Sequence, residues 1–350
     1  MQILEILKEG LEQGGSDLFL LPGSAPCIKT GGHMELLPEE RLVPADTRAL
    51  LEQIYTSAGR SMETLDSTGD DDFSFSVPGL GRFRCNAYKQ RSSLAAVIRI
   101  VPFGLPDSER MHIPPVVMDL YKKNNGLVLV TGPAGSGKST TLACLIDRIN
   151  RKTSGHIITL EDPIEYVHSH AGCLVSQREI SLDTESYASA LRAALRQTPS
   201  VILLGEMRDF ETIQTALTAA ETGQLVLSTL HTVGAAKTID RVVDVFPAHQ
   251  QAQIRIQLSM VLQAVVSQQL LPGVDGELHP AFEIMLSTPA IQNMIREGKT
   301  HQLDNVIFSG ADMGMRTMDG DILRLFKEGK ISRDVALSHA TDPVNMARKI

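Results

Sequence analysis

One short glycine-rich segment limits the folds open to this chain more than any other feature. Residues Gly132–Ser139 have the sequence Gly-Pro-Ala-Gly-Ser-Gly-Lys-Ser, which fits the pattern G-x-x-x-x-G-K-[ST]. The apolar run Leu127–Thr131 precedes them, and a helical pattern over Thr140–Asn150 follows. Glycines at these positions let successive backbone N–H groups point inward around phosphate oxygens. The segment therefore predicts a buried strand that leads through a phosphate-binding loop into a helix.

Each residue of this loop has an expected role in binding ATP. Lys138 is expected to reach the β- and γ-phosphates, and the Ser139 hydroxyl to ligate Mg²⁺. Thr140 lies at the predicted helix N-terminus, where backbone dipoles favour an anion. Nine residues are expected to bind the nucleotide, namely Gly132, Pro133, Ala134, Gly135, Ser136, Gly137, Lys138, Ser139 and Thr140.

Strands and helices alternate after the loop. Strands are predicted at His156–Leu160, Val201–Leu204 and Leu225–Thr229, and helices at Thr184–Gln197, with Asp183 as N-cap, and at Glu211–Glu221. Buried apolar strands that alternate with helices indicate an α/β fold with a mostly parallel sheet covered on both faces. After about Leu271 the pattern becomes helical, including Ile291–Glu297, Asp321–Glu328 and Ser332–His339.

The first hundred residues have a different pattern, and 350 residues are too many for most single domains. Helices are predicted at 3–13 and 45–58, a strand at 17–21, and three further strands between Phe73 and Ile100. A cluster of prolines then marks a linker, with members at Pro102, Pro106, Pro114 and Pro115. We expect an α+β domain at 1–101, a linker at 102–115, an ATPase core at 116–271 and a helical subdomain at 272–350.

Composition excludes several classes of function. The net charge is −8 and the chain has no Trp, so nonspecific binding of nucleic acid is not expected to be its main activity. The four cysteines stand far apart, without a C-x-x-C pair, which argues against a zinc ribbon or a thioredoxin-like site. No run reaches the roughly 18–20 apolar residues of a membrane span.

Acidic residues follow two of the predicted strands. Glu206 comes after Val201–Leu204 and Gly205, where a Walker-B acid is expected, and as a Glu it is expected to hold Mg²⁺ through water. The segment Glu161–Glu165 follows another strand, and an acid there can deprotonate the attacking water. The residues alone do not separate Glu161, Asp162 and Glu165 as the base.

Two further features have both a structural and a functional interpretation. His231 follows Leu225–Thr229 directly and could sense the γ-phosphate, although a lone histidine is more often structural. Arg82, Arg84 and Arg99 in the first domain could mark a solvated face. They could equally be cations that one domain or subunit supplies to the ATP site of another.

Together these segments resemble a known family. Gly132–Thr141, Glu161–Glu165, Gly205–Asp209 and Thr229–Thr232 have the order and spacing of the secretion ATPases, and within them the chain is similar to the PilT-like retraction ATPases of type IV pili. Gly15-Ser16-Asp17-Leu18 and the segment Thr288–Lys299 extend the resemblance over almost the whole chain.

The resemblance implies a hexameric motor that hydrolyses ATP to retract the pilus. Its N-terminal domain would be PAS-like and its ATPase domain RecA-like. Glu165 would be the catalytic base, Glu206 the Walker-B acid and His231 a histidine-box residue. Arg84 and Arg99, with Arg82 less surely, would approach the phosphates. The implied location is cytoplasmic, at the inner-membrane pilus base. The implied partners are a platform protein, through it pilin, and a second retraction ATPase.

Two residues depart from the family pattern. Gln224 stands where PilT-like proteins usually have His, and because a glutamine cannot carry charge, we expect no cationic sensor there. Gln292 stands where an Arg is common. Two other functions remain possible from the sequence: an accessory, PilU-type retraction ATPase that depends on a partner motor, and a nucleotide-gated assembly module with vestigial hydrolysis.

Overall fold

The chain forms two compact units, which divide between Gly104 and Leu105. The computed structural model describes residues 2–30, 33–101 and 104–350. Pro102, the first proline of the predicted linker, lies outside the described residues. Ile113, near the end of that segment, is buried in the core of the second unit with Val117 and Met118.

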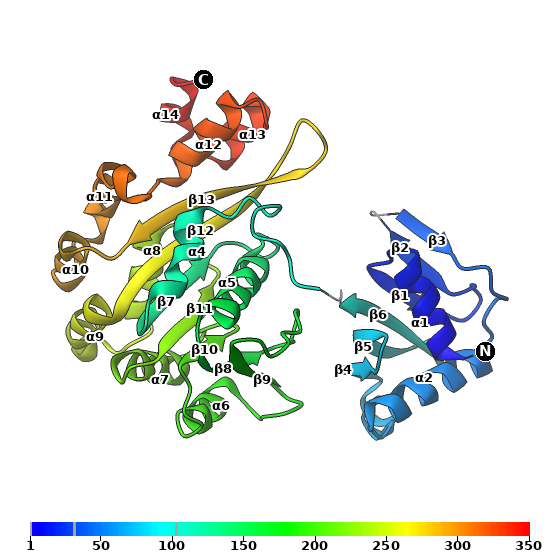
Figure 1. The fold of residues 1–350 in the computed structure, drawn as a ribbon. Helices are drawn as coiled ribbons and strands as arrows, with labels where there is room; N and C mark the ends of the chain where they lie inside the picture. The colour runs from blue at the N-terminus through cyan, green and yellow to red at the C-terminus, as the bar shows by residue number, and fades with distance from the viewer. Residues whose placement is uncertain (1, 31–32, 102–103) are drawn as a thin grey trace. The chain divides into compact units, whose positions relative to one another are not determined.

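The first unit is built on an antiparallel sheet with the strand order β3-β2-β1-β6-β5-β4 (Figure 1). Its strands are β1 (Asp17–Leu20), β2 (Cys27–Thr30), β3 (His33–Leu36), β4 (Asp70–Val77), β5 (Gly81–Gln90) and β6 (Ser93–Val101), and its helices are α1 (Ile3–Glu12), α2 (Pro44–Ala58) and α3 (Glu63–Thr68). Alternate residues of β6 such as Ile98 and Ile100 pack with Leu7 and Leu51 of the helices in one core. The opposite sheet face carries Arg84 and Arg99.

The sheet of the second unit has the order β13-β12-β7-β11-β10-β8-β9, in which all neighbours are parallel except β12 and β13. Its strands are β7 (Gly126–Thr131), β8 (Gly155–Glu161), β9 (Cys173–Glu179), β10 (Val201–Leu204), β11 (Leu225–Leu230), β12 (Leu262–Pro272) and β13 (Leu278–Leu286). Every residue of β7, β10 and β11 is buried, which explains their unbroken apolar runs.

Helices cover both faces of this sheet. They are α4 (Pro115–Met118), α5 (Lys138–Lys152), α6 (Tyr187–Ala194), α7 (Phe210–Glu221), α8 (Ala235–Asp244) and α9 (Ala248–Val261). Alternate residues of β7 enter two different cores, because successive side chains of a strand point to opposite faces. Leu127 and Leu129 pack with α6 to α9, whereas Val128 and Val130 pack with α4 and α5. The strand before the glycine loop is therefore fixed from both sides.

The C-terminal part is mostly helical, with one exception to the expectation. Its helices are α10 (Pro289–Arg296), α11 (Leu303–Ser309), α12 (Met318–Lys327), α13 (Arg333–His339) and α14 (Pro343–Ala347). Residues Leu278–Leu286, within the segment expected to be helical, instead form β13, which pairs with β12 over nine residue pairs. Helices α12 to α14 lie together beside this strand pair (Figure 1).

The predicted N-cap of α6 is also corrected. Helix α6 begins after Ser186, whose hydroxyl accepts a hydrogen bond from the backbone N–H of Ser189. Asp183 instead accepts from the backbone N–H of Glu179, at 2.8 Å, and so closes the turn after β9. No helix in the described ranges is long and apolar enough to cross a membrane.

Candidate functional site

The predicted site segments follow four neighbouring parallel strands. The loop at Gly132 follows β7, His231 follows β11, Glu206 follows β10 after one residue, and Glu161 ends β8. These strands are adjacent in the order β7-β11-β10-β8. Because the carboxyl ends of parallel strands meet at one edge, the fold brings the four segments to the same edge of the sheet.

The glycine loop has a backbone that suits its glycines. Gly132, Gly135 and Gly137 have φ angles of 142°, 75° and 85°, a region that residues with a side chain rarely adopt. A side chain at Gly132 would collide with the carbonyl oxygen of Gln268 in β12. The side chain of Gln268 accepts a hydrogen bond from the Thr141 hydroxyl at 2.7 Å. Strand β12 thus supports the loop from one side.

Lys138 is the buried cation of the loop. Its side chain is folded back onto the loop, where Nζ donates to the carbonyl oxygens of Gly132 and Pro133 at 2.9 and 2.8 Å. Burial lowers the pKa of Lys138, while the charges of Glu165 and Glu206 raise it. Both acids therefore lie close enough to act on this ammonium group.

The start of α5 offers groups to an anion. Gly137, its N-cap, supplies no side-chain acceptor for the first N–H groups of the helix. The Ser136 hydroxyl is buried, and its oxygen has no hydrogen-bond partner among the described residues. Ser139 is exposed in the first turn. Free backbone donors, a buried hydroxyl and a nearby ammonium form a cradle that fits phosphate groups.

Glu206 and His231 meet beside the loop. The Oε2 atom of Glu206 lies 3.4 Å from Nε2 of His231 and 2.7 Å from Nε of Arg208. A hydrogen bond from the Met207 N–H to the Thr229 carbonyl, at 3.2 Å, joins the two segments. Arg208 is an addition to the expected site. It lies within the motif Gly205–Asp209, and its ion pair with Glu206 places it at the site.

The structure separates the two glutamates of the acidic segment. Glu161 is partly buried, and its Oε1 accepts hydrogen bonds from Thr159 Oγ1 and Gln177 Nε2 at 2.5 and 3.3 Å. Burial raises the pKa of Glu161 to about 7. Glu165, in contrast, is exposed, and its charge acts on Lys138. An exposed carboxylate whose charge acts on Lys138 is the better placed of the two to accept a proton.

The acidic segment is tied to the loop helix. The hydroxyl of Tyr166, next to Glu165, hydrogen-bonds with the hydroxyl of Thr140 at 2.9 Å. The backbone N–H of Ile164 donates to Glu179 of β9 at 3.0 Å. These two contacts hold Glu165 beside the first turn of α5.

Gln224 lies at the other edge of the sheet. It precedes β11, whereas His231 follows the same strand. Its carbonyl oxygen accepts from the N–H of Gly126, the first residue of β7, at 3.0 Å. A strand of six residues separates the two ends by roughly 20 Å. Gln224 is therefore remote from the phosphate loop of its own chain.

Two of the three expected arginines of the first unit, Arg84 and Arg99, are paired with acids. Arg84 and Arg99 face each other across β5 and β6. Arg84 makes two hydrogen bonds to Asp72, at 3.0 and 2.6 Å, and Arg99 makes one to Asp17 at 3.1 Å. Arg82 donates to the Ser76 hydroxyl at 3.3 Å. Partly exposed ion pairs of this kind contribute only about 0–1 kcal/mol, so an incoming anion can displace the acid.

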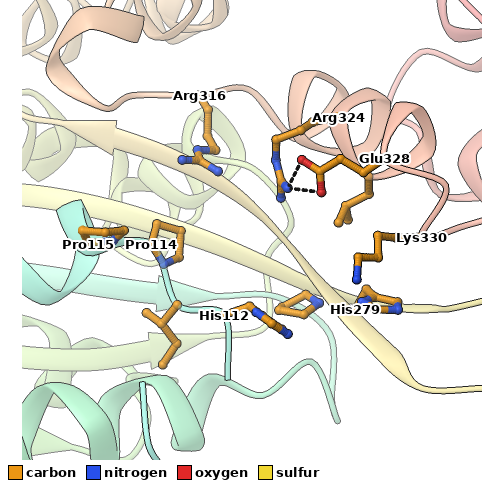
Figure 2. Close-up of a pocket in the computed structure, with 11 residues that line it drawn as sticks. His112, Pro114, Pro115, His279, Arg316, Arg324, Glu328 and Lys330 are labelled. Carbon is orange, nitrogen blue, oxygen red and sulfur yellow. Dashed lines mark hydrogen bonds and ion pairs between the residues drawn. The ribbon is translucent and has the colours of Figure 1, made fainter. Parts of the chain in front are cut away.

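A cavity that no sequence motif indicated lies beside the loop, and a second cavity adjoins it. One, of about 420 Å³, is lined by Gly137, Thr140 and Thr141 and by apolar side chains that include Met111, Ile113, Leu270, Leu278 and Pro280. The second cavity has a volume of about 400 Å³ and reaches Arg316 and Arg324. His112, His279 and Lys330 line both cavities. Figure 2 shows these basic side chains around it, with Arg324 paired to Glu328.

The residues at the sheet edge fit a magnesium ion that is coordinated mainly by nucleotide phosphates and water. Among the described residues no group of three His, Cys, Asp or Glu side chains could hold a metal ion. Mg²⁺ in nucleotide sites takes one or two protein oxygens and completes its shell with phosphates and water. The hydroxyl of Ser139 and the carboxylate of Glu206 are oxygen donors of the required kind.

Comparisons with known proteins give the family. Residues 108–307 match the family described as Type II/IV secretion system protein. The chain is 46% identical to the Type IV pilus retractation ATPase PilT of Pseudomonas aeruginosa, over 99% of this chain and 100% of that protein. It is 38% identical to the Type IV pilus ATPase PilU of the same organism, over 97% and 89%. The solved structure of the pilus retraction motor PilT with bound ADP has a TM-score of 0.92, 46% identity and 99% coverage of both chains. The chain therefore belongs to the type II/IV secretion system protein family, in its branch of PilT-like pilus ATPases.

Proposed function

We propose that this chain is the subunit of a homo-hexameric motor that hydrolyses ATP to retract type IV pili. The observation that carries the proposal is the convergence of Lys138, Glu165 and the Glu206–His231 pair at one edge of the sheet. Full-length similarity to a pilus retraction ATPase supplies the biological context.

The residues have separate roles in hydrolysis. The loop N–H groups and Lys138 bind the phosphates, and Lys138 exchanges its two carbonyl partners for phosphate oxygens. Ser139 and Glu206 would hold Mg²⁺, which neutralises charge on the phosphates. Glu165 takes a proton from the attacking water as the oxygen bonds to the γ-phosphorus and the bond to the β-phosphate oxygen breaks. His231 contacts Glu206, so a change in the ligands of Glu206 would move the loop that begins with His231 after β11.

The nucleoside part of ATP has a matching place in the cavity next to the loop. That cavity begins at Gly137 and Thr140, and its lining combines apolar side chains such as Leu270 and Pro280 with polar and charged ones. Sites for small molecules combine apolar surface with polar groups that fix the orientation of the ligand. We assign it to the adenosine of ATP.

Assembly of subunits into a ring would bring further cations to the ATP site. We propose that Arg84 and Arg99 exchange Asp72 and Asp17 for nucleotide phosphates when subunits form a ring. The motor would act on the cytoplasmic side of the inner membrane, on a platform protein and through it on pilin. ATP-driven movement of one unit against the other would supply the work.

Hydrolysis and assembly are tested together. Phosphate release by the purified chain is measured beside its mass with and without ATP, and K138A and E165Q serve as variants. We expect an ATP-dependent hexamer whose turnover falls at least about a hundredfold in both variants. Normal turnover in both would remove the catalytic assignment, and ATP binding without phosphate release would favour the assembly module.

The second candidate is an accessory retraction ATPase, and the 38% identity to PilU supports it. The chain alone is expressed in a strain without any retraction ATPase. Restored twitching motility supports the independent motor. Restoration that requires a second retraction ATPase would support the accessory role.

A further inference from the structure

A buried carboxylate outside the ATP site holds the loop that carries His231. Glu283 lies on β13 and is 7% exposed. Its Oε1 atom accepts a hydrogen bond from the backbone N–H of Ala235 at 2.7 Å, and its Oε2 from that of Met318 at 3.3 Å. Ala235 and Met318 are the first residues of α8 and α12. One side chain therefore joins two helix N-termini from different parts of the sequence.

The first of these helices begins where the His231 loop ends. Only the four residues 231–234 separate β11 from α8. The Glu283 side chain accepts from the N–H of the first helical residue, where the helix dipole favours a negative charge. Burial raises the pKa of Glu283, and the bonds from Ala235 and Met318 counter this shift. The exit of the His231 loop is thus fixed to β13.

A second buried contact joins the His231 loop to the strand that precedes the phosphate loop. The hydroxyl of Ser267 on β12 accepts from the N–H of Gly234 at 3.0 Å and lies 2.6 Å from the hydroxyl of Thr131. Thr131 is the residue immediately before Gly132 of the phosphate loop. Thr131, Ser267 and Glu283 are all buried, so water does not compete for these bonds.

We infer that Glu283 is a positioning residue for ATP hydrolysis, which acts by holding His231 within reach of Glu206. This inference rests on the proposed function. It is supported by the short loop, by the 3.4 Å contact between His231 and Glu206, and by the anchoring of the loop end on Glu283. The Oε2 atom of Glu283 accepts from the first residue of α12. A movement of α12 would therefore shift Glu283 and, through Ala235, the loop that carries His231.

The substitution E283Q keeps the shape of the side chain and removes one acceptor. The amide NH₂ then faces a backbone N–H, and one helix N-terminus loses its partner. We expect kcat for ATP hydrolysis to fall on the order of tenfold, while the Kd for ADP stays within about twofold. If Glu283 served only general packing, its substitution would not lower kcat for hydrolysis while leaving the Kd for ADP unchanged.

A double-mutant cycle with H231A tests the route of the effect. If Glu283 acts through His231, E283Q has no further effect on kcat in the H231A background. The matched control is D321N. Asp321 is also buried and also bonds β13 to α12, through the N–H of Phe282 at 2.9 Å. Within the described part of the chain the other partners of its carboxylate are Arg316 and Arg324, and it bonds neither to the His231 loop nor to α8. We expect D321N to lower stability and leave kcat within about twofold.

Each outcome bears on the inference. Unchanged kcat in E283Q, or an equal loss in wild-type and H231A backgrounds, would overturn it while leaving the proposed function intact. A wild-type chain without hydrolysis would overturn both. If E283Q does not fold, S267A replaces it in the cycle, because it removes the bond from the Gly234 N–H and so loosens the same loop while both Glu283 bonds stay in place. Additive effects of S267A and H231A would then overturn the inference.

Discussion

His231 Nε2 and Glu206 Oε2 lie 3.4 Å apart, although 25 positions separate them in the sequence. They meet because β10 and β11 are parallel neighbours whose carboxyl ends share one edge. We expect H231A to lower kcat on the order of ten- to a hundredfold, since Glu206 loses a partner at the phosphate side. The Kd for ADP should stay within about twofold. Steady-state hydrolysis and fluorescent-ADP titration measure the two, and a loss confined to the ADP affinity would contradict the role.

The two glutamates of the acidic segment should differ in function. E165Q is expected to lose hydrolysis by at least about a hundredfold, because its carboxylate is exposed and acts on Lys138. E161Q should keep activity within about threefold, because Glu161 is occupied by hydrogen bonds from Thr159 and Gln177. Phosphate release by the matched pair checks this. The reverse ranking would transfer the base to Glu161.

Glu161 should also give stability a defined pH dependence. Its pKa is raised from 4.5 to about 7, mainly by burial, so the folded state holds this proton more tightly than the unfolded state. The Glu161 contribution to the free energy of unfolding therefore falls as the pH rises from 4.5 through about 7, and is constant above that. We expect wild type to lose on the order of 1–3 kcal/mol relative to E161Q across this window. Urea unfolding of both proteins at pH 5 and pH 8 measures it, and a constant difference would contradict the prediction.

The fold was predictable where sequence patterns are local. The glycine loop, the strand before it and the helix after it are encoded by contiguous residues, and Val201–Leu204 was found from its apolar run. Strand β13 was not, because Leu278–Leu286 includes Pro280 and becomes a strand only by pairing with β12. The short strands β2 and β3 were missed for the same reason, since antiparallel pairing defines them.

The site was predictable only in part. Glu161 and Glu165 could not be told apart in sequence, because the difference lies in their burial and hydrogen bonds. Glu283 gave no signal at all. Its role depends on Ala235 and Met318, which are 48 residues before it and 35 after it, and a single sequence does not reveal such contacts.

Two glycines of the loop should respond differently to alanine. At Gly132 a Cβ atom would collide with the Gln268 backbone and lie 2.7 Å from the Ser136 hydroxyl, so the loop must shift. At Gly135 a Cβ atom would meet nothing within 4 Å, and only the strain of its φ of 75° remains. We expect G132A to weaken ADP binding at least about tenfold and G135A less than about fivefold. Calorimetric titration measures both, and equal losses would show that the Gln268 contact does not set the loop geometry.

Gln224 should tolerate the histidine that PilT-like proteins usually have. It directly precedes β11, and the six residues of that strand separate it from His231, so a charged ring there acts on the phosphate loop of its own chain only weakly. We expect Q224H to change kcat by less than about twofold and to leave the pH profile of hydrolysis between pH 6 and 8 unchanged. Q224A provides the control for loss of the amide, whose oxygen accepts a hydrogen bond from Thr222 at 2.9 Å. A new step in the pH profile near 6.5, present in Q224H and absent in Q224A, would mean that this edge of the sheet meets an ATP site in the assembled ring.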